Sequence, residues 1–357
     1  YESSVDPIIH FGLGEHKIVD SIEVRWPDNT QQILEKTSAN QLVLIDQSNA
    51  TPMSYPKIKN TEKKWLVEVT DSLTVTFEHQ QDLMVDFKLQ PILPHMHSRS
   101  GPGIAVADVN IDGLEYFYIG GAAGQSGAMF LQKKDGTFDS LDWSKDSVFE
   151  DMGVLFFDAN KDGYPDLYVV SGGIVASSDN KAYQDRLYLN DGHGNFKISN
   201  ALPPIASSGS VVTATDFDQD GDLDLFVGGR VVPGQYPMPT KSYLLENLAN
   251  EDSDQIRFRD ISVNVNDWEK LTMVTSAIWS DYDNDGWMDL IVCGEFMPIT
   301  FFHNESGQLV YANEQTELVN TEGWWNSITG GDFDQDGDTD YLVGNLGLNT
   351  KYRASLE

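Results

Sequence analysis

Aspartate and asparagine residues recur at alternate positions in five short segments, a spacing that could hold a metal ion. The segments are DVNIDG at 108, DANKDG at 158, DFDQDG at 216, DYDNDG at 281 and DFDQDG at 332. Positions 1, 3 and 5 are always Asp or Asn, and position 6 is always Gly. Ca²⁺ prefers six to eight oxygen ligands, and alternate side chains in a tight loop can converge on one ion while glycine lets the backbone turn. The pattern therefore predicts five calcium-binding loops.

The predicted ligands in each loop are the side chains at positions 1, 3, 5 and 9 and the backbone carbonyl at position 7. Residue types at position 7 vary widely, as expected where only the carbonyl binds the ion. Loop one has Asn110 at position 3 and Tyr116 at position 9, so it keeps two carboxylates and we expect the weakest site there. The candidate ligand residues are Asp108, Asn110 and Asp112 in loop one; Asp158, Asn160, Asp162, Tyr164 and Asp166 in loop two; Asp216, Asp218, Asp220, Asp222 and Asp224 in loop three; Asp281, Asp283, Asp285, Trp287 and Asp289 in loop four; and Asp332, Asp334, Asp336, Asp338 and Asp340 in loop five.

The acidic segments could instead be plain turns or EF-hands, but both alternatives are less favoured. A single Asp-Gly cluster could be a hydrophilic turn. Five copies in register favour a cation, because without one the carboxylates would repel at roughly 1 kcal/mol per pair even in a water-like dielectric. An EF-hand would need a Glu at position 12 and flanking helices. Position 12 is instead aliphatic in every copy: Ile119, Val169, Val227, Val292 and Val343.

Short β-rich runs flank every loop. GIAVAD and GVLFFD precede the first two loops, and DLYVVSG, DLFVGG and DLIVCG follow loops two to four. Each loop should therefore join two strands of a hairpin, with about four strands in each repeat of 50 to 65 residues. That is the size of a propeller blade. We expect an all-β fold, a calcium-binding β-propeller of four-stranded blades with at least five motif-bearing blades, cut inside its ring.

Residues 95 to 350 resemble the FG-GAP/VCBS repeat proteins, whose propeller blades carry calcium in Asp-x-Asp-x-Asp-Gly-x-x-Asp loops. The N-terminal stretch resembles the ASPIC/UnbV module of cartilage-acidic-protein-like proteins, through Phe11-Gly12-Leu13-Gly14 and Val24-Arg25-Trp26-Pro27. In that family the module tends to follow a propeller. The resemblance therefore implies that the first residues are the tail of an upstream unit.

Composition suggests three regions. Residues 1–47 should form a small partial ASPIC/UnbV-like β-module, with strands in SIEVRWP, QQILEK and QLVLID around a PDNT turn. Residues 48–64 are polar, hold two prolines and lack either strand or helix periodicity, so a linker is expected there. The propeller should occupy residues 65–357.

The charge balance limits the partners that the chain can have. It has 56 acidic and 23 basic side chains, a formal net charge of -33, which disfavours nucleic acid and anionic lipid surfaces. The single cysteine, Cys293, excludes an intrachain disulfide. No apolar run is long enough for a membrane helix, and the sequence opens at Tyr1 without a signal peptide. We expect a piece of a longer exported precursor, with no direct membrane insertion.

A few other residues could carry chemistry. His95 and His97 form an HxH pair that could seat zinc, but we expect them to be bystanders. The tryptophans Trp268, Trp279, Trp287, Trp324 and Trp325 could stack on sugars, although core packing is favoured. In GNLGLN, Asn345, Gly347 and Asn349 are expected in a turn. GxSxG and HExxH motifs are absent from the sequence, and its conspicuous Asp pairs are committed to the loops.

The sequence favours a non-enzymatic, calcium-stabilised β-propeller at the cell surface or beyond, for adhesion or for recognition of a protein or glycan. Extracellular calcium modules work at about 10⁻⁴ to 10⁻³ M, a range that cytosolic calcium does not reach. One alternative is a polysaccharide-active, lyase-like enzyme on the same scaffold, which would need a basic or tyrosine residue facing a charged groove. Another is a purely architectural segment of a surface protein.

Overall fold

The chain forms two compact units, residues 1–68 and residues 69–357. The computed structural model describes residues 10–53, 66–81, 84–141, 143, 146–174, 180–249, 256–316 and 318–347. Trp65, the expected first residue of the propeller, lies outside the described residues, as do residues 54–64 of the expected linker and Asn349.

The first unit contains one small antiparallel sheet. Strand β1 (Ile18–Arg25) pairs with β2 (Thr30–Ser38), and β2 pairs with β3 (Thr51–Pro52). The predicted turn between β1 and β2 is present: the Asp28 carboxylate accepts hydrogen bonds from the backbone and hydroxyl of Thr30. The prediction of a strand in QLVLID was wrong. Leu42 and Leu44 in that segment are 78% and 91% exposed, so the segment has no apolar face to bury against the sheet.

The second unit is built from consecutive antiparallel sheets, in which sequential strands pair with one another. The first three sheets have four strands each, and a fourth set of four strands is extended by the hairpin β20–β21, whose strand β20 also pairs with β17. The strands are β4 (Ile104–Ala107), β5 (Tyr116–Ile119), β6 (Ala128–Gln132) and β7 (Phe138–Leu141); β8 (Asp151–Phe157), β9 (Asp166–Ser171), β10 (Arg186–Asn190) and β11 (Phe196–Ile198); β12 (Gly209–Thr215), β13 (Asp224–Gly229), β14 (Tyr243–Asn247) and β15 (Phe258–Asp260); β16 (Met273–Ser280), β17 (Asp289–Met297), β18 (Thr300–Asn304) and β19 (Leu309–Tyr311); and β20 (Gly323–Gly331) and β21 (Asp340–Asn345).

Helical elements in the described residues are short. The only α-helix among them is α1 (Thr70–Leu73). The 3-10 helices are η1 (Gln47–Asn49), η2 (Asp86–Lys88), η3 (His97–Arg99), η4 (Asn180–Tyr183), η5 (Ser262–Asn264), η6 (Trp268–Lys270) and η7 (Asn313–Gln315). The fold is therefore all-β, as predicted, and within the described part of the chain no helix has the length and apolar character needed to span a membrane.

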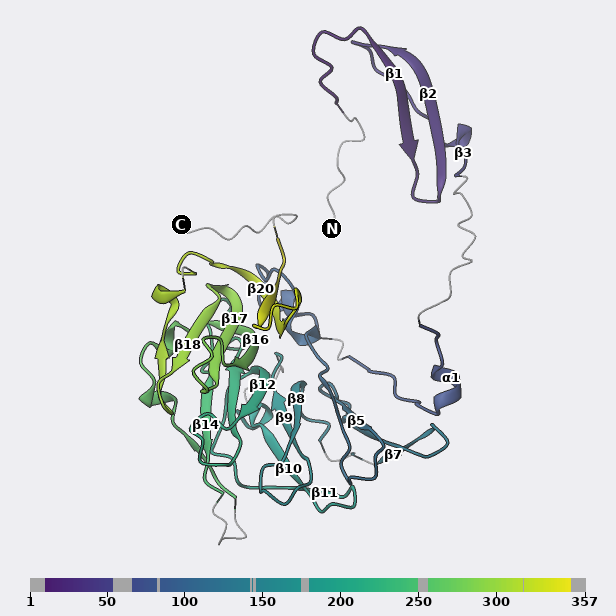
Figure 1. Cartoon of the computed structure of the whole chain (residues 1–357). Coiled ribbons are helices and arrows are strands. Elements are labelled where there is room, and N and C mark those ends of the chain that lie inside the picture. The colour runs from purple at the N-terminus through teal and green to yellow at the C-terminus, as the bar shows by residue number, and fades with distance from the viewer. Residues whose placement is uncertain are drawn as a thin grey trace. The chain divides into compact units, whose positions relative to one another are not determined.

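The first strands of neighbouring sheets lie side by side. Strand β8 contacts β4 and β12, and β16 contacts β12 and β20, so the sheets follow one another in chain order (Figure 1). The backbones come very close between sheets two and three: Gly172 bridges Gly209, and a Cβ on Gly172 would lie 2.2 Å from the Gly209 carbonyl oxygen. Only glycine fits such an approach.

The hydrophobic core fills the spaces between successive sheets. One cluster joins sheets two and three through Tyr168, Leu187, Leu225 and Leu245, and another joins sheets three and four. The second strands of these sheets are almost wholly buried, and their sequences DLYVVS, DLFVGG and DLIVCG are nearly continuous apolar runs. The acidic loops lie at the N-terminal ends of these second strands, so this packing fixes the position of each loop.

Candidate metal centres

Each acidic motif occupies the turn between the first and second strands of its repeat. Loop one joins β4 to β5, loop two joins β8 to β9, and the same placement recurs up to loop five between β20 and β21. The predicted hairpins are thus confirmed. In loops two to five the Asp at position 9 is the first residue of the second strand, so the sheet itself positions that carboxylate. These residues are Asp166, Asp224, Asp289 and Asp340.

The loop backbone turns through two residues with positive φ. The glycine at position 6 has φ between 84° and 101°, a conformation that glycine adopts without strain. Position 4 also adopts the left-handed conformation, with φ between 58° and 64°, although no glycine stands there. The residues at position 4 are Ile111, Lys161, Gln219, Asn284 and Gln335.

Hydrogen bonds turn the aspartates toward the inside of each loop. In all five loops the Gly N–H at position 6 donates to the carboxylate at position 1, over 2.8 to 3.2 Å. The N–H at position 7 donates to the carboxylate at position 5, over 2.8 to 3.2 Å. These bonds hold several carboxylates on one side of the turn, where their mutual repulsion favours a bound cation.

Three loops bring acidic side chains close enough to share one ion. In each of these groups the ligand atoms lie within 4.8 Å of one another: Asp216, Asp218 and Asp224; Asp281, Asp283 and Asp289; and Asp332, Asp334 and Asp336. Within the described residues, loops one and two form no such group of three. Loop two still places Asp158, Asn160 and Asp162 in the same hydrogen-bonded turn.

Loop three has unsatisfied carboxylate oxygens that fit a cation. Oδ1 of Asp216 and Oδ1 of Asp222 are buried without a hydrogen-bond partner. Burial, and then the charge of Asp220, raises the pKa of Asp222 to about 6; burial raises the pKa of Asp224 to about 8. An ionised carboxylate in such a place is costly unless a positive charge compensates it. For Asp222, part of that compensation comes from Lys161, whose Nζ lies 3.8 Å from Asp222 Oδ2. The donor set consists of hard oxygens, which suits Ca²⁺.

Loop four includes a residue that sequence analysis missed. His303, in β18, places Nδ1 3.0 Å from Asp289 Oδ1 and 3.4 Å from Asp283 Oδ2. With Asp283 and Asp285 it forms a further group of possible metal ligands. His303 stands 14 residues after Asp289, and no motif marks that position. Only the pairing of β17 with β18 brings it to the loop.

Loop one is closed by a neutral group. The Tyr116 hydroxyl donates to Asp112 Oδ2 at 3.0 Å, and Asn110 Nδ2 lies 3.0 Å from the tyrosine oxygen. A phenol stands where loops two to five have a carboxylate. The loop therefore keeps the shape of the others with less negative charge, and the expectation that its site is the weakest stays a prediction.

His95 lies beside a buried ion pair, and the centroid of the His97 ring lies 4.4 Å from that of the His95 ring. Arg230 Nη2 donates to Glu295 Oε1 at 2.5 Å, and His95 Nε2 lies 3.6 Å from the same oxygen. His97 is 2% exposed, and neither ring nitrogen has a hydrogen-bond partner. Burial, then the charges of His95 and Arg230, lowers the pKa of His97 to about 3. In the described part of the chain, neither histidine belongs to a group of three metal-ligating side chains.

Three of the candidate tryptophans and the GNLGLN segment have structural surroundings, whereas Trp287 and Trp325 are only partly buried. Trp268, Trp279 and Trp324 are buried, so they pack in the core rather than forming an exposed platform. The Asn345 side chain accepts a hydrogen bond from the Gly347 N–H at 2.7 Å, which confirms the expected turn.

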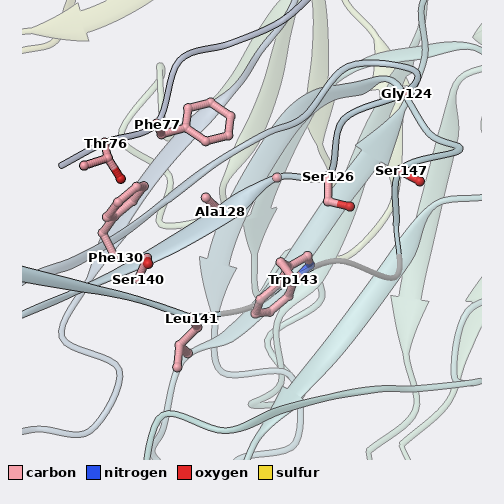
Figure 2. Close-up of a pocket in the computed structure, with 11 residues that line it drawn as sticks. Thr76, Phe77, Gly124, Ser126, Ala128, Phe130, Ser140, Leu141, Trp143 and Ser147 are labelled. Carbon is pink, nitrogen blue, oxygen red and sulfur yellow. The ribbon is translucent and has the colours of Figure 1, made fainter.

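A pocket of about 400 Å³ opens in the first repeat (Figure 2). Figure 2 shows the rings of Phe77, Phe130 and Trp143 around it, together with hydroxyl groups such as that of Ser140. The Trp143 indole N–H is buried without a hydrogen-bond partner. The described residues that line the pocket include no charged side chain, so it offers ring faces and hydroxyl groups rather than metal ligands.

The fold and the loops define a β-rich protein with a repeated acidic hairpin. Two protein-family models match parts of the sequence. The model of the FG-GAP-like repeat matches residues 174–227 and 281–343, and the model of the ASPIC and UnbV domain matches residues 1–52. These matches agree with the resemblance of the sequence to FG-GAP repeat proteins that carry a partial ASPIC/UnbV module.

Among solved structures, the chain is similar to the V. cholerae biofilm matrix protein Bap1, with 14% sequence identity and a TM-score of 0.35. The match covers 68% of this chain and 34% of Bap1, so the chain spans about a third of that protein's length. No curated protein matches the sequence.

Proposed function

We propose that the chain is a calcium-stabilised β-propeller that acts outside the cell as a recognition or adhesion scaffold, without catalysing a reaction. The observation that carries this proposal is the repeated acidic loop, which stands at the same hairpin of five successive repeats. In the third repeat, Oδ1 of Asp216, at position 1 of that loop, is buried without a hydrogen-bond partner. A cation shared with Asp218 and Asp224 would satisfy it.

The propeller arrangement is supported by the order of the sheets. The first strand of each repeat lies against the first strand of the next, from β4 through β8, β12 and β16 to β20. Repeats one to four then run through their second, third and fourth strands in order. Radial repetition of four-stranded sheets around an axis is the propeller architecture.

Calcium is favoured over other cations by the ligands that the loops offer. Carboxylate and carbonyl oxygens are the ligands of Ca²⁺, whereas zinc prefers Cys and His. The candidate side-chain ligands at positions 1, 3, 5 and 9 of loops two to five are carboxylates, apart from the amide of Asn160. Among the described residues, His303 near loop four is the one nitrogen donor that groups with them. Calcium concentrations outside the cell suit sites of about 10⁻⁴ to 10⁻³ M, which supports an extracellular location.

The pocket in the first repeat supports a glycan as the ligand. Aromatic rings with hydroxyl neighbours suit a sugar ring, which needs an apolar face and hydrogen-bond partners at its edge. Phe77 and Trp143 would supply the rings, and Ser126 and Ser140 the hydroxyl groups. A protein ligand and a purely architectural role are the other outcomes to be distinguished.

A glycan array probed in millimolar calcium and again in chelator tests the proposal. We expect calcium-dependent binding to one class of glycan, lost in Phe77→Ala and retained in Phe87→Ala, a change at a phenylalanine that does not line the pocket. If calcium raises the melting temperature but no glycan binds, the glycan ligand is contradicted, and a protein ligand or an architectural role becomes the favoured function. Release of a shortened saccharide would contradict the non-enzymatic part of the proposal.

A further inference from the structure

Three asparagines link neighbouring acidic loops to one another. Each is the last residue of the third strand of its repeat: Asn190 in β10, Asn247 in β14 and Asn304 in β18. The backbone N–H of each donates to the position-9 aspartate of its own loop, over 2.7 to 2.8 Å. The side-chain Nδ2 of each donates to the position-2 carbonyl of the loop in the preceding repeat, over 2.6 to 2.9 Å.

Within a loop, the residue at position 2 connects the bond from the asparagine to the aspartate at position 9, because its own backbone N–H donates to that aspartate. The N–H of Ala159 donates to Asp166, and that of Phe217 donates to Asp224, over 3.0 and 3.3 Å. Starting at loop three, the contacts therefore run from Asp224 to Phe217, from Phe217 to Asn304, and from Asn304 to Asp289 in loop four. The same series joins loop two to loop three through Ala159 and Asn247.

Burial makes these contacts difficult to break. Asn247, Asn304 and Asp289 are 0% exposed, and Asp224 is 1% exposed. A buried carbonyl or carboxylate that loses its partner is left with a desolvated polar group that nothing compensates. We therefore expect movement of one position-9 carboxylate to disturb the next loop, since these buried groups have little access to water that could replace the lost bonds.

We propose that Asn247 and Asn304 couple the metal loops of neighbouring repeats, so that a cation in one loop strengthens cation binding in the next. Asn190 makes the same donor bonds, but loop one has Tyr116 at position 9 and so lacks the aspartate through which the coupling would run. This inference rests on the proposed calcium binding. An ion that fixes the aspartate at position 9 also fixes the hydrogen bonds leading from it, so the neighbouring loop loses less conformational entropy when it binds. Asparagine suits the role because its amide donates to a carbonyl, which a carboxylate of the same shape cannot do.

A double-mutant cycle on loops three and four tests the coupling. Asp220→Ala removes a ligand of loop three, and Asn304→Ala removes the link while keeping the backbone N–H that binds Asp289. Terbium binding at loop four is followed through luminescence excited at Trp287, which stands at position 7 of that loop. Trp287→Phe should abolish the terbium luminescence, and this control shows that the luminescence comes from an ion bound at loop four. The matched control for the link is Asn195→Ala, because the Asn195 side chain donates to Asp191, outside the five acidic loops.

With the link intact, we expect Asp220→Ala to weaken terbium binding at loop four at least fivefold, about the lower end of typical coupling between sites. In the Asn304→Ala background the same substitution should change that affinity less than about twofold, and in the Asn195→Ala background the fivefold effect should remain. An equal effect of Asp220→Ala in the Asn304→Ala background would overturn the coupling while leaving calcium binding intact. Absence of terbium and calcium binding in the parent chain would instead overturn the proposed function. If Asn304→Ala fails to fold, Asn304→Ser removes the same donor with a smaller loss of polarity.

Discussion

The Tyr116 hydroxyl donates a hydrogen bond to Asp112 Oδ2 at 3.0 Å, within loop one. The phenol takes the place that an aspartate holds in loops two to five. We predict that Tyr116→Asp restores a third carboxylate and adds one bound calcium per chain, because ligand charge tunes calcium affinity. Calcium stoichiometry after equilibrium dialysis measures this.

Tyr116→Phe is the matched control for that experiment. It removes the hydroxyl without adding a charge, so the number of bound ions should stay that of the parent chain. Equal stoichiometry in Tyr116→Asp and the parent would contradict the idea that the tyrosine is what weakens loop one.

Loops four and one should differ in how much stability they contribute. Asp285→Ala removes a ligand from a loop with four aspartates, whereas Asp112→Ala acts in a loop with two. In saturating calcium we expect Asp285→Ala to cost about 2 to 3 kcal/mol more, since that is the stabilisation of the folded state by one site at a calcium concentration of about 100 times its dissociation constant. Chemical denaturation of both variants measures the difference, and equal losses would show that loop one is a full site.

Removal of calcium should lower the thermal stability of the second unit. Four sites at about 100 times their dissociation constants would contribute about 11 kcal/mol, which is comparable with the whole stability of a typical domain. Melting curves in chelator and in millimolar calcium test this, with magnesium at the same ionic strength as the control. Coincident midpoints would be incompatible with four structural calcium sites.

The buried pair between Arg230 and Glu295 should matter more than an exposed pair. Arg230→Ala would leave Glu295, which is 0% exposed, without its 2.5 Å partner, and we expect a loss of about 3 to 5 kcal/mol. Lys133→Ala breaks the exposed pair with Asp139 and should cost less than about 1 kcal/mol. Urea unfolding of the two variants measures both losses, and similar values would mean that Glu295 is protonated or hydrated in the folded chain.

Burial of His97 predicts a loss of stability in acid. Its pKa is lowered from 6.5 to about 3 in the folded chain, so between these values the unfolded chain binds a proton that the folded chain does not. The contribution of His97 is therefore complete above about pH 6.5 and decreases as the pH falls, by about 2 kcal/mol at about pH 5. His97→Phe should lose that much less stability than the parent over this range, whereas His193→Asn, at an exposed site, should follow the parent. Urea unfolding at each pH measures the difference, and parallel curves for His97→Phe and the parent would contradict it.

Sequence alone predicted the repeats, the hairpins and the loop geometry, because these depend on residues close together in the chain. An Asp at position 1 reaches the N–H at position 6 within one turn, so its role can be read from spacing. The strands beside the loops also follow from local apolar runs. The strand expected in QLVLID failed because Leu42 and Leu44 have no sheet face to cover.

Tertiary structure decided the contacts that join distant residues. His303 reaches loop four only through the pairing of β17 with β18, and Asn304 reaches Phe217 across 87 residues. His97, expected to be a bystander, is buried against the Tyr236 ring because segments far apart in sequence pack together there. Local spacing determines which residues can form a metal loop, but burial and strand pairing determine what surrounds it, because both depend on how the sheets stack.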